Sequence, residues 1–313
     1  MIIIARVKKA PDALLGLSWS LTLFLFVYLI THTENAAAAV TSSLRVCALR
    51  LIPSLFPFMV LTNLICSTGL TDLAARALGN VFSKATGLPP DGAAIFLLGS
   101  VGGFPIGAVA AKKLLDRGRL SAADAGRLIA FSNNAGLAFC IGGIGPLFGS
   151  AAVGLKLWGV QLGAAVLFAL VTAERHVSIS APRGPERNRV SPGRLLTLLS
   201  ESVSGSAVSM LKVCAFAVFF GTVGDVICRI LPPLPAALAA QFLELTLTAG
   251  LSSAFGRAGL PICAFALGFA GLSVHAQVAA ILEGSGVPMR RFCLFKLAQG
   301  AVSALVFAIL CQG

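Results

Sequence analysis

Apolar residues follow one another along this chain in runs that are interrupted by short charged segments. Residues 13–31, 92–111, 128–155 and 157–173 contain no Asp, Glu, Lys or Arg. A helix needs about 20 consecutive apolar residues to cross the hydrocarbon core of a bilayer. The pattern therefore predicts an all-α polytopic membrane protein, whose direct partner is the lipid bilayer.

The composition agrees with this pattern. Of the 313 residues, 57% are hydrophobic and 12% are charged, against about 45–50% and about 25% in an ordinary soluble domain. The net charge of +12 could suggest a nucleic-acid partner, but the basic residues are spread over the short segments 6–9, 112–127 and 175–194. Short basic segments between apolar runs are typical of cytoplasmic loops, so we expect no nucleic-acid partner.

Eight cysteines lie apart from one another and form no C-x-x-C pair. We interpret them as small apolar residues of the interior, with metal binding or disulfide formation as the weaker alternative. The sequence also lacks a G-x-S-x-G, H-E-x-x-H or P-loop motif. We therefore expect a protein that is not an enzyme and that holds no metal ion or cofactor.

The N-terminal part, residues 1–44, is predicted to hold a first membrane helix at 13–32 and an external linker. Arg6, Lys8 and Lys9 precede this helix and indicate a cytoplasmic N-terminus by the positive-inside rule. A cleaved signal peptide is the alternative. The apolar run is longer than the about 7–15 residues of a typical signal sequence, which favours a retained helix.

The segment 92–111 is predicted to form a re-entrant hairpin instead of a complete span. A span would place the basic segment 112–127 outside, against the positive-inside rule. Because glycine and proline permit or force a turn, the candidate residues for the tip are Gly102, Gly103, Pro105 and Gly107. A hairpin at membrane depth needs protein or a watery cavity around it, so this segment also predicts a cavity.

A helix is predicted to begin after Ser121, since Asp124 stands three positions later, as in a capping box. This helix should continue through Asn133 and Asn134, about 16 Å into the bilayer by helical rise and close to its midplane. Amides at that depth are costly and mark functional sites. Both residues are candidates for solute binding, with hydrogen bonding between helices as the alternative.

The polar and basic segment 174–204 is predicted to be a cytoplasmic linker. It divides the chain into a first half, residues 45–173, and a second half, residues 205–313.

A glycine-interrupted apolar stretch occurs in both halves, at 96–103 and at 265–272, which places a second hairpin tip at Gly271. Paired interrupted segments point to the central site of a transporter. An inverted repeat would put the second hairpin on the outside. Three arginines favour the inside instead, and the sequence leaves both arrangements open: Arg257, Arg290 and Arg291.

Five further polar residues of the second half lie in apolar stretches and are candidates for solute binding: Glu244, Thr246, Ser273, His275 and Gln277. Glu244 could take up a proton or a coupling cation, or pair with Lys212 or Lys296. The imidazole of His275 could carry protons, because imidazole gains and loses a proton near neutral pH, or it could form a structural hydrogen bond.

Four motifs follow one another along the chain: RLIPSLFPFMVL at 50–61, GGFPIG at 102–107, FSNNAG at 131–136 and GLSVHAQ at 271–277. Together they resemble the sporulation integral membrane protein YlbJ family, also called stage V sporulation protein V, from about residue 45 to the end. The resemblance implies two nucleoside-recognition Gate domains, similar to those of concentrative nucleoside transporters. It also implies a role in moving dipicolinic acid across the outer forespore membrane.

We therefore expect an integral membrane transporter for a small anionic or heterocyclic solute, with dipicolinic acid as the solute that the resemblance implies. The N-termini of half-helices would attract its carboxylates. The expected location is the plasma membrane or the outer forespore membrane, and a homo-oligomer is compatible with the sequence. The alternative is a non-transporting scaffold for assembly of the spore envelope, in which the buried polar residues serve helix packing.

Overall fold

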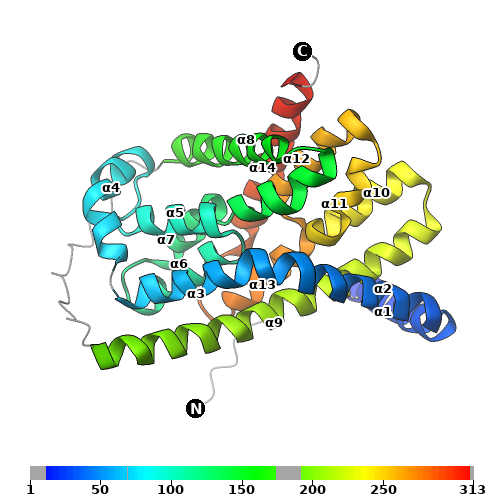
Figure 1. Ribbon diagram of the computed structural model, residues 1–313, viewed down its shortest axis with the longest axis horizontal. Coiled ribbons are helices and arrows are strands. Elements are labelled where there is room, and N and C mark those ends of the chain that lie inside the picture. Colours follow the sequence, from blue (N-terminus) through cyan, green and yellow to red (C-terminus); the bar gives the residue numbers. More distant parts are fainter. Residues whose placement is uncertain (1–11, 69, 174–191, 311–313) are drawn as a thin grey trace.

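The computed structural model describes residues 12–68, 70–173 and 192–310 (Figure 1), and within these ranges the regular structure is helical, with no strand. Large apolar side chains on the outer surfaces of the helices are exposed, as suits contact with lipid. The chain is thus a polytopic α-helical membrane protein, which confirms the predicted all-α class. Among the described residues, five helical segments are long and apolar enough to cross a bilayer: Thr33–Thr68, Ala151–Val171, Arg194–Ile230, Gly256–Ile281 and Met289–Leu310.

Helix α1 (Asp12–Thr31) is followed almost directly by a helix that runs from Thr33 to Thr68. The external linker predicted up to residue 44 is helical instead, because four successive alanines at 36–39 favour helix. Proline has no backbone N–H to donate to the preceding turn, and the helix adapts to Pro53 by forming a π-helical turn just before it. The long helix consists of α2 (Thr33–Val46), η1 (Cys47–Leu51) and α3 (Ile52–Thr68).

Helix α4 (Thr71–Thr86) lies at one end of the molecule (Figure 1) and stops at Gly87, whose φ of 68° is in the left-handed region. Arg119 holds it there: Nη1 lies 3.1 Å from Asp72 Oδ1 and Nη2 lies 2.6 Å from Asp91 Oδ1. Burial raises the pKa of the Asp91 carboxyl, and the charge of Arg119 opposes this shift. The ion pairs tie the start of α4 to the turn that precedes α5.

Helices α5 (Gly92–Gly102) and α6 (Ile106–Asp116) pack on one another and form the first hairpin. Its turn falls between Gly103, which has a φ of 91°, and Pro105, which follows a cis peptide bond. The structure thus places the turn inside the glycine cluster that predicts it.

Helix α7 (Ala122–Ser132) begins at the predicted cap, Ser121, whose Oγ accepts a hydrogen bond at 3.0 Å from the backbone N–H three residues later. The helix ends at its eleventh residue, and the next four residues are not helical. The chain then enters a π-helical turn, η2 (Phe139–Ile144). The expectation of a continuous helix through Asn133 and Asn134 is therefore wrong. Asparagine side chains compete for backbone hydrogen bonds and weaken a helix at such a position.

Helix α8 (Ala151–Val171) follows the short helix η3 (Gly145–Phe148) and returns to the end of the molecule at which α7 begins. Arg127 demonstrates this, because its Nη2 donates to Thr86 O at 2.7 Å and to Thr172 O at 3.0 Å. These two carbonyl groups terminate α4 and α8. Both ends of the hairpin and the end of α8 therefore lie at one end of the molecule.

Helix α9 (Pro192–Ile230) packs along α3 (Figure 1). It begins inside the segment that the sequence analysis treats as a linker, and residues 174–191 of that segment lie outside the described residues. Helices α10 (Pro233–Leu243) and α11 (Leu245–Ser253) then pack on one another, with Glu244 between them. They form the second hairpin.

After the short helix η4 (Gly256–Ala258), helices α12 (Gly259–Phe269) and α13 (Gly271–Ile281) form one span, which is broken at Ala270, where φ is 75°. Helix α14 (Met289–Leu310) packs along α12. The predicted second tip around Gly271 is thus a break within a span. The chain reverses direction earlier, at Glu244.

Two sets of elements repeat in the same order: a hairpin, a broken helix and an unbroken helix. A Cβ on Gly126, in α7, would lie 3.3 Å from Cγ1 of Val287, in the short loop that joins α13 to α14. Since α13 ends where α7 begins, the broken helices run in opposite directions. This inverted arrangement places Arg290 near the basic segment 112–127 and Arg257 at the other end of the molecule. The three arginines of the second half therefore do not share one side, and they no longer argue against an inverted repeat.

We expect single cysteines at Arg117 and Glu283 to be labelled from the cytoplasmic side, and a cysteine at Arg257 from the opposite side. All three side chains are exposed in the structure. The measurement is labelling with a membrane-impermeant maleimide in vesicles of both orientations, with the native cysteines replaced. Labelling of Arg117 and Glu283 from opposite sides would contradict the inverted arrangement. The counterpart at Arg187 lies outside the described residues.

Candidate functional site

The turn of the first hairpin packs on the break after α7 through backbone atoms. A Cβ on Gly103 would lie 2.8 Å from the N atom of Gly136, and a Cβ on Gly136 would lie 2.9 Å from the O atom of Gly102. A Cβ on Gly107 would lie 2.8 Å from the last carbonyl oxygen of α7. These glycines allow two backbones to approach closely, and Pro105 is the N-cap residue directly before α6.

The second hairpin meets the break between α12 and α13 in a corresponding way. A Cβ on Gly271 would lie 3.2 Å from Leu243 O and 3.3 Å from Leu245 N. Glu244, between these two residues, is 1% exposed, and its carboxylate oxygens accept hydrogen bonds from Thr246 Oγ1 at 2.7 and 2.8 Å. A carboxylate directly before α11 is also favoured by the positive end of the helix dipole. Each hairpin thus places its turn on the break of the next helix.

Four fully buried polar side chains form a network beside the α7 break. Lys296 Nζ donates to Asn134 Oδ1 at 3.2 Å and to Gln299 Oε1 at 2.8 Å. Gln299 Nε2 donates to the same Asn134 Oδ1 at 2.9 Å and to Gln161 O at 3.0 Å. The Gln161 amide in turn donates to Leu267 O at 2.9 Å and accepts from the backbone of the break at 3.0 Å. The network joins the break to α8, α12 and α14.

Helix α14 passes both breaks. A Cβ on Gly268, two residues before the second break, would lie 2.7 Å from the Cα atom of Gly300. The neighbouring Gln299 bonds to Asn134 in the first break. The polar groups of the two breaks are therefore gathered around one stretch of α14.

Asn133 is as buried as Asn134, but neither its Oδ1 nor its Nδ2 has a hydrogen-bond partner among the described residues. The hydroxyl of Ser132 is unpartnered as well. Buried polar atoms without a partner are rare and point to a bound water, ion or ligand. The two asparagines are therefore not equivalent: the protein satisfies Asn134 and leaves Asn133 unsatisfied.

Three candidate residues on α13 are buried within about two turns of the second break: Ser273, His275 and Gln277. His275 Nδ1 donates to the carbonyl oxygen four residues earlier at 2.7 Å, and its ring lies 4.7 Å from the ring of Phe269 and 5.0 Å from that of Phe292. Its Nε2 has no partner in the described part of the chain. Gln277 Nε2 donates to Ser273 Oγ at 3.3 Å, while Gln277 Oε1 is unpartnered.

The structure thus places the candidates from the sequence at a break or within about two turns of one. Three further residues belong to the site and were not predicted: Gln161, Lys296 and Gln299. Lys296 and Gln299 stand three positions apart, hence on one face of α14, and this pattern could have revealed them. Glu244 pairs with neither lysine considered for it, since Lys212 is exposed and Lys296 binds amides. Among the described residues, no group of three His, Cys, Asp or Glu side chains could hold a metal ion.

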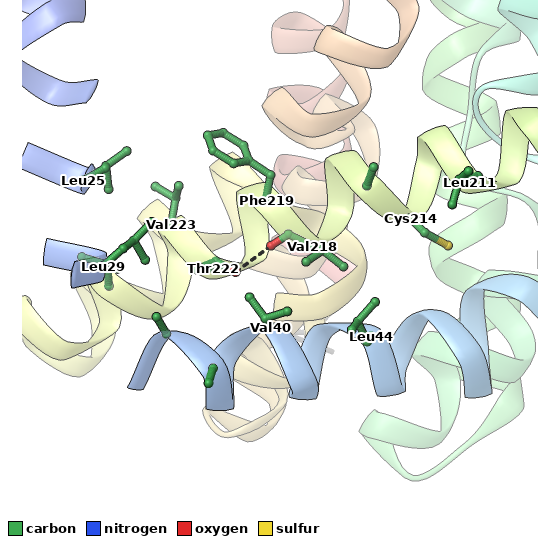
Figure 2. A pocket seen from close by; sticks show the side chains of 14 residues that line it. Leu25, Leu29, Val40, Leu44, Leu211, Cys214, Val218, Phe219, Thr222 and Val223 are labelled. Atoms are coloured by element: carbon green, nitrogen blue, oxygen red, sulfur yellow. Dashed lines mark hydrogen bonds between the residues drawn. The ribbon is translucent and has the colours of Figure 1, made fainter. Parts of the chain in front are cut away.

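An open groove of about 690 Å³ lies between α9 and helices α1 and α2 (Figure 2). Its lining is apolar apart from Cys214 and Thr222, and Thr222 Oγ1 donates to Val218 O, in its own helix, at 2.8 Å. Such a groove suits a lipid chain and offers no group that would orient a polar solute. A smaller cavity of about 350 Å³ lies between α7, α8 and α14, where its wall includes Arg127, Phe168, Arg291 and Phe295.

The comparisons with known proteins give one informative match. The chain is 26% identical, over an alignment of 331 positions, to the sporulation integral membrane protein YlbJ of Bacillus subtilis (strain 168), and the match covers 93% of this chain and 81% of that protein. No protein-family model matches the chain, and no solved structure matches it significantly.

Proposed function

Since the chain belongs to the YlbJ family of sporulation integral membrane proteins, we propose that it transports a small anionic or heterocyclic solute during spore maturation. The proposed solute is dipicolinic acid, and the proposed location is the outer forespore membrane, with the N-terminus in the cytoplasm. The observation that carries the proposal is the packing of each hairpin turn on a broken helix. Interrupted helices persist in a bilayer where they line a solute site or a cavity.

The chemistry of dipicolinic acid suits the groups at the breaks. Two carboxylates and a pyridine nitrogen all accept hydrogen bonds, so a site for this molecule needs N–H donors. The ammonium of Lys296 and the amide of Asn133 supply such donors at membrane depth. Glu244, at the other break, would take up a coupling proton or cation. An ionisable side chain at membrane depth is energetically costly and for that reason marks a functional site.

A non-transporting scaffold in spore envelope assembly is the second candidate. The contacts of Asn134, Gln161 and Gln299 support it, because these amides already satisfy one another and need no solute. The unpartnered amide of Asn133 favours the transporter instead, because a bound solute would satisfy it.

Purified protein reconstituted into liposomes should take up radiolabelled dipicolinate with saturable kinetics, and an excess of unlabelled dipicolinate should compete. Protein-free liposomes, and liposomes containing an unrelated helical membrane protein at equal density, are the controls. Uptake at the level of these controls, by protein that remains folded in the bilayer, would refute transport of dipicolinate and favour the scaffold.

A further inference from the structure

Lys296 is a charged residue with 0% of its surface exposed. Its ammonium donates to Asn134 Oδ1 at 3.2 Å and to Gln299 Oε1 at 2.8 Å. Both acceptors are neutral amide oxygens. In the part of the chain that the structure describes, no carboxylate forms an ion pair with this ammonium, so its charge is not balanced by a described residue.

The charged groups of three other basic residues have partners that give them a structural role. Arg119 pairs with two carboxylates. Arg127 donates to the carbonyl groups that terminate two helices. Lys113, near the end of α6, is half-buried and donates to Asn63 Oδ1 at 2.6 Å. Lys296 differs from all three, because it lies within a candidate membrane span and beside a helix break.

The energetic cost of this arrangement requires an explanation. Moving an ammonium from water into a low-dielectric interior costs more than hydrogen bonds to neutral amides return. A buried lysine without a counter-charge therefore tends to lose its proton, and an ionisable group at membrane depth marks a pathway for a solute or an ion. A bound anion would supply the missing counter-charge.

The surrounding groups leave donors for such an anion. An ammonium has three N–H donors, and Lys296 uses two of them. Gln299 Nε2 holds Asn134 Oδ1 at 2.9 Å from a second direction, so the amide that orients the ammonium is itself fixed. The next residue along the chain, Asn133, has an unpartnered amide. One charged and one neutral donor are thus available at the same break.

We infer that Lys296 selects the charge of the solute: one solute carboxylate binds its ammonium, and a second acceptor of the solute binds Asn133 Nδ2. The ligand class is a small carboxylate with a second hydrogen-bond acceptor, on an aromatic or heterocyclic ring. This inference rests on the proposed function and names the residue that makes the site select anions. A neutral molecule of the same shape leaves the buried charge unbalanced and is rejected for that reason.

The test compares three ring compounds in proteoliposomes: dipicolinate, picolinate with its single carboxylate, and the neutral pyridine-2,6-dicarboxamide. The wild type should bind and take up both carboxylates and reject the diamide. Lys296→Met should weaken the binding of both carboxylate compounds roughly 10- to 150-fold, the factor for a lost hydrogen bond between charged groups. This variant should no longer discriminate against the diamide. Lys296→Arg should retain the preference for carboxylates. Lys113→Met is the matched control, because it removes an ammonium that also binds an amide, and it should keep the selectivity of the wild type.

The outcomes separate this inference from the proposed function. If Lys296→Met takes up dipicolinate like the wild type, the inference is wrong and transport of dipicolinate stands. If the wild type takes up picolinate but not dipicolinate, and Lys296→Met abolishes that uptake, the inference holds and the proposed solute is wrong. If the Met variant does not fold, Lys296→Gln, which keeps a hydrogen-bond donor without the charge, takes its place. Retained charge selectivity in that variant overturns the inference.

Discussion

Gly103→Leu is expected to reduce dipicolinate uptake to the level of protein-free liposomes while the protein still inserts into the membrane. The Cβ alone would lie 2.8 Å from Gly136 N and 3.0 Å from Gly136 Cα, closer than real Cβ atoms approach backbone. Gly103 also has a φ of 91° and a ψ of 174°, a conformation that essentially only glycine adopts and that adds about 1–3 kcal/mol of strain for a residue with a Cβ. The hairpin turn must therefore move away from the α7 break, and the site loses one wall. Uptake and membrane abundance are measured together.

The matched control is Gly118→Leu. Gly118 also has a positive φ, of 67°, but a Cβ there would meet no atom within 4 Å, so this variant places a Cβ at a positive φ without the steric overlap. It should retain uptake. Gly136→Ala provides an independent check, because its Cβ would lie 2.9 Å from Gly102 O and should displace the same contact from the other side. Normal uptake by Gly103→Leu would mean that the turn does not pack against the break during transport.

The first hairpin could be predicted because several local signals agree there. Gly102, Gly103 and Pro105 disfavour a continuous helix, and the basic segment that follows argues against a complete span. The Ser121 cap was equally readable, since its side chain bonds to the backbone three residues later. The hairpin turn and the start of α7 are both determined by residues that are close together in the sequence.

The second hairpin could not be predicted in this way. The chain reverses direction at Glu244, between Leu243 and Leu245, where no glycine or proline marks a turn. The glycine-containing stretch 265–272 resembles 96–103 in composition, yet there the span is broken at Ala270 and continues in α13. Packing against the neighbouring helices, rather than the local sequence, decides which interruption becomes a turn.

The polar network was missed for a related reason. A lysine near the start of an apolar helix is ordinarily interpreted as a residue that reaches the membrane surface, and Lys296 stands seven residues after the first residue of α14. Its burial depends on Asn134, which is 162 positions away in the sequence. The break after α7 brings the two together, and the sequence predicts a continuous helix there.

Asn133→Leu and Asn134→Leu should differ in their effects on stability, although the two residues are neighbours in the sequence. Asn134→Leu removes the acceptor for Lys296 and Gln299 and the donor to Phe131 O at 2.7 Å. Each buried group left unsatisfied costs about 1–3 kcal/mol, although hydrogen bonds between membrane helices average about 0.6 kcal/mol. We expect a lower thermal unfolding temperature in detergent and a lower membrane abundance for this variant.

Asn133→Leu removes no hydrogen bond, because neither atom of this amide has a partner among the described residues. Exchanging an unsatisfied buried amide for an apolar side chain of similar size is neutral or stabilising, so the unfolding temperature should not fall. Uptake should nevertheless drop roughly 2- to 150-fold, the range for losing a hydrogen bond to a neutral or a charged solute group. A control at Asn63, which binds Lys113 at the end of α6, should lose stability without a change in solute preference. If Asn133→Leu transports dipicolinate like the wild type, the unsatisfied amide is not a solute contact, and the assignment of this break as the binding site is wrong.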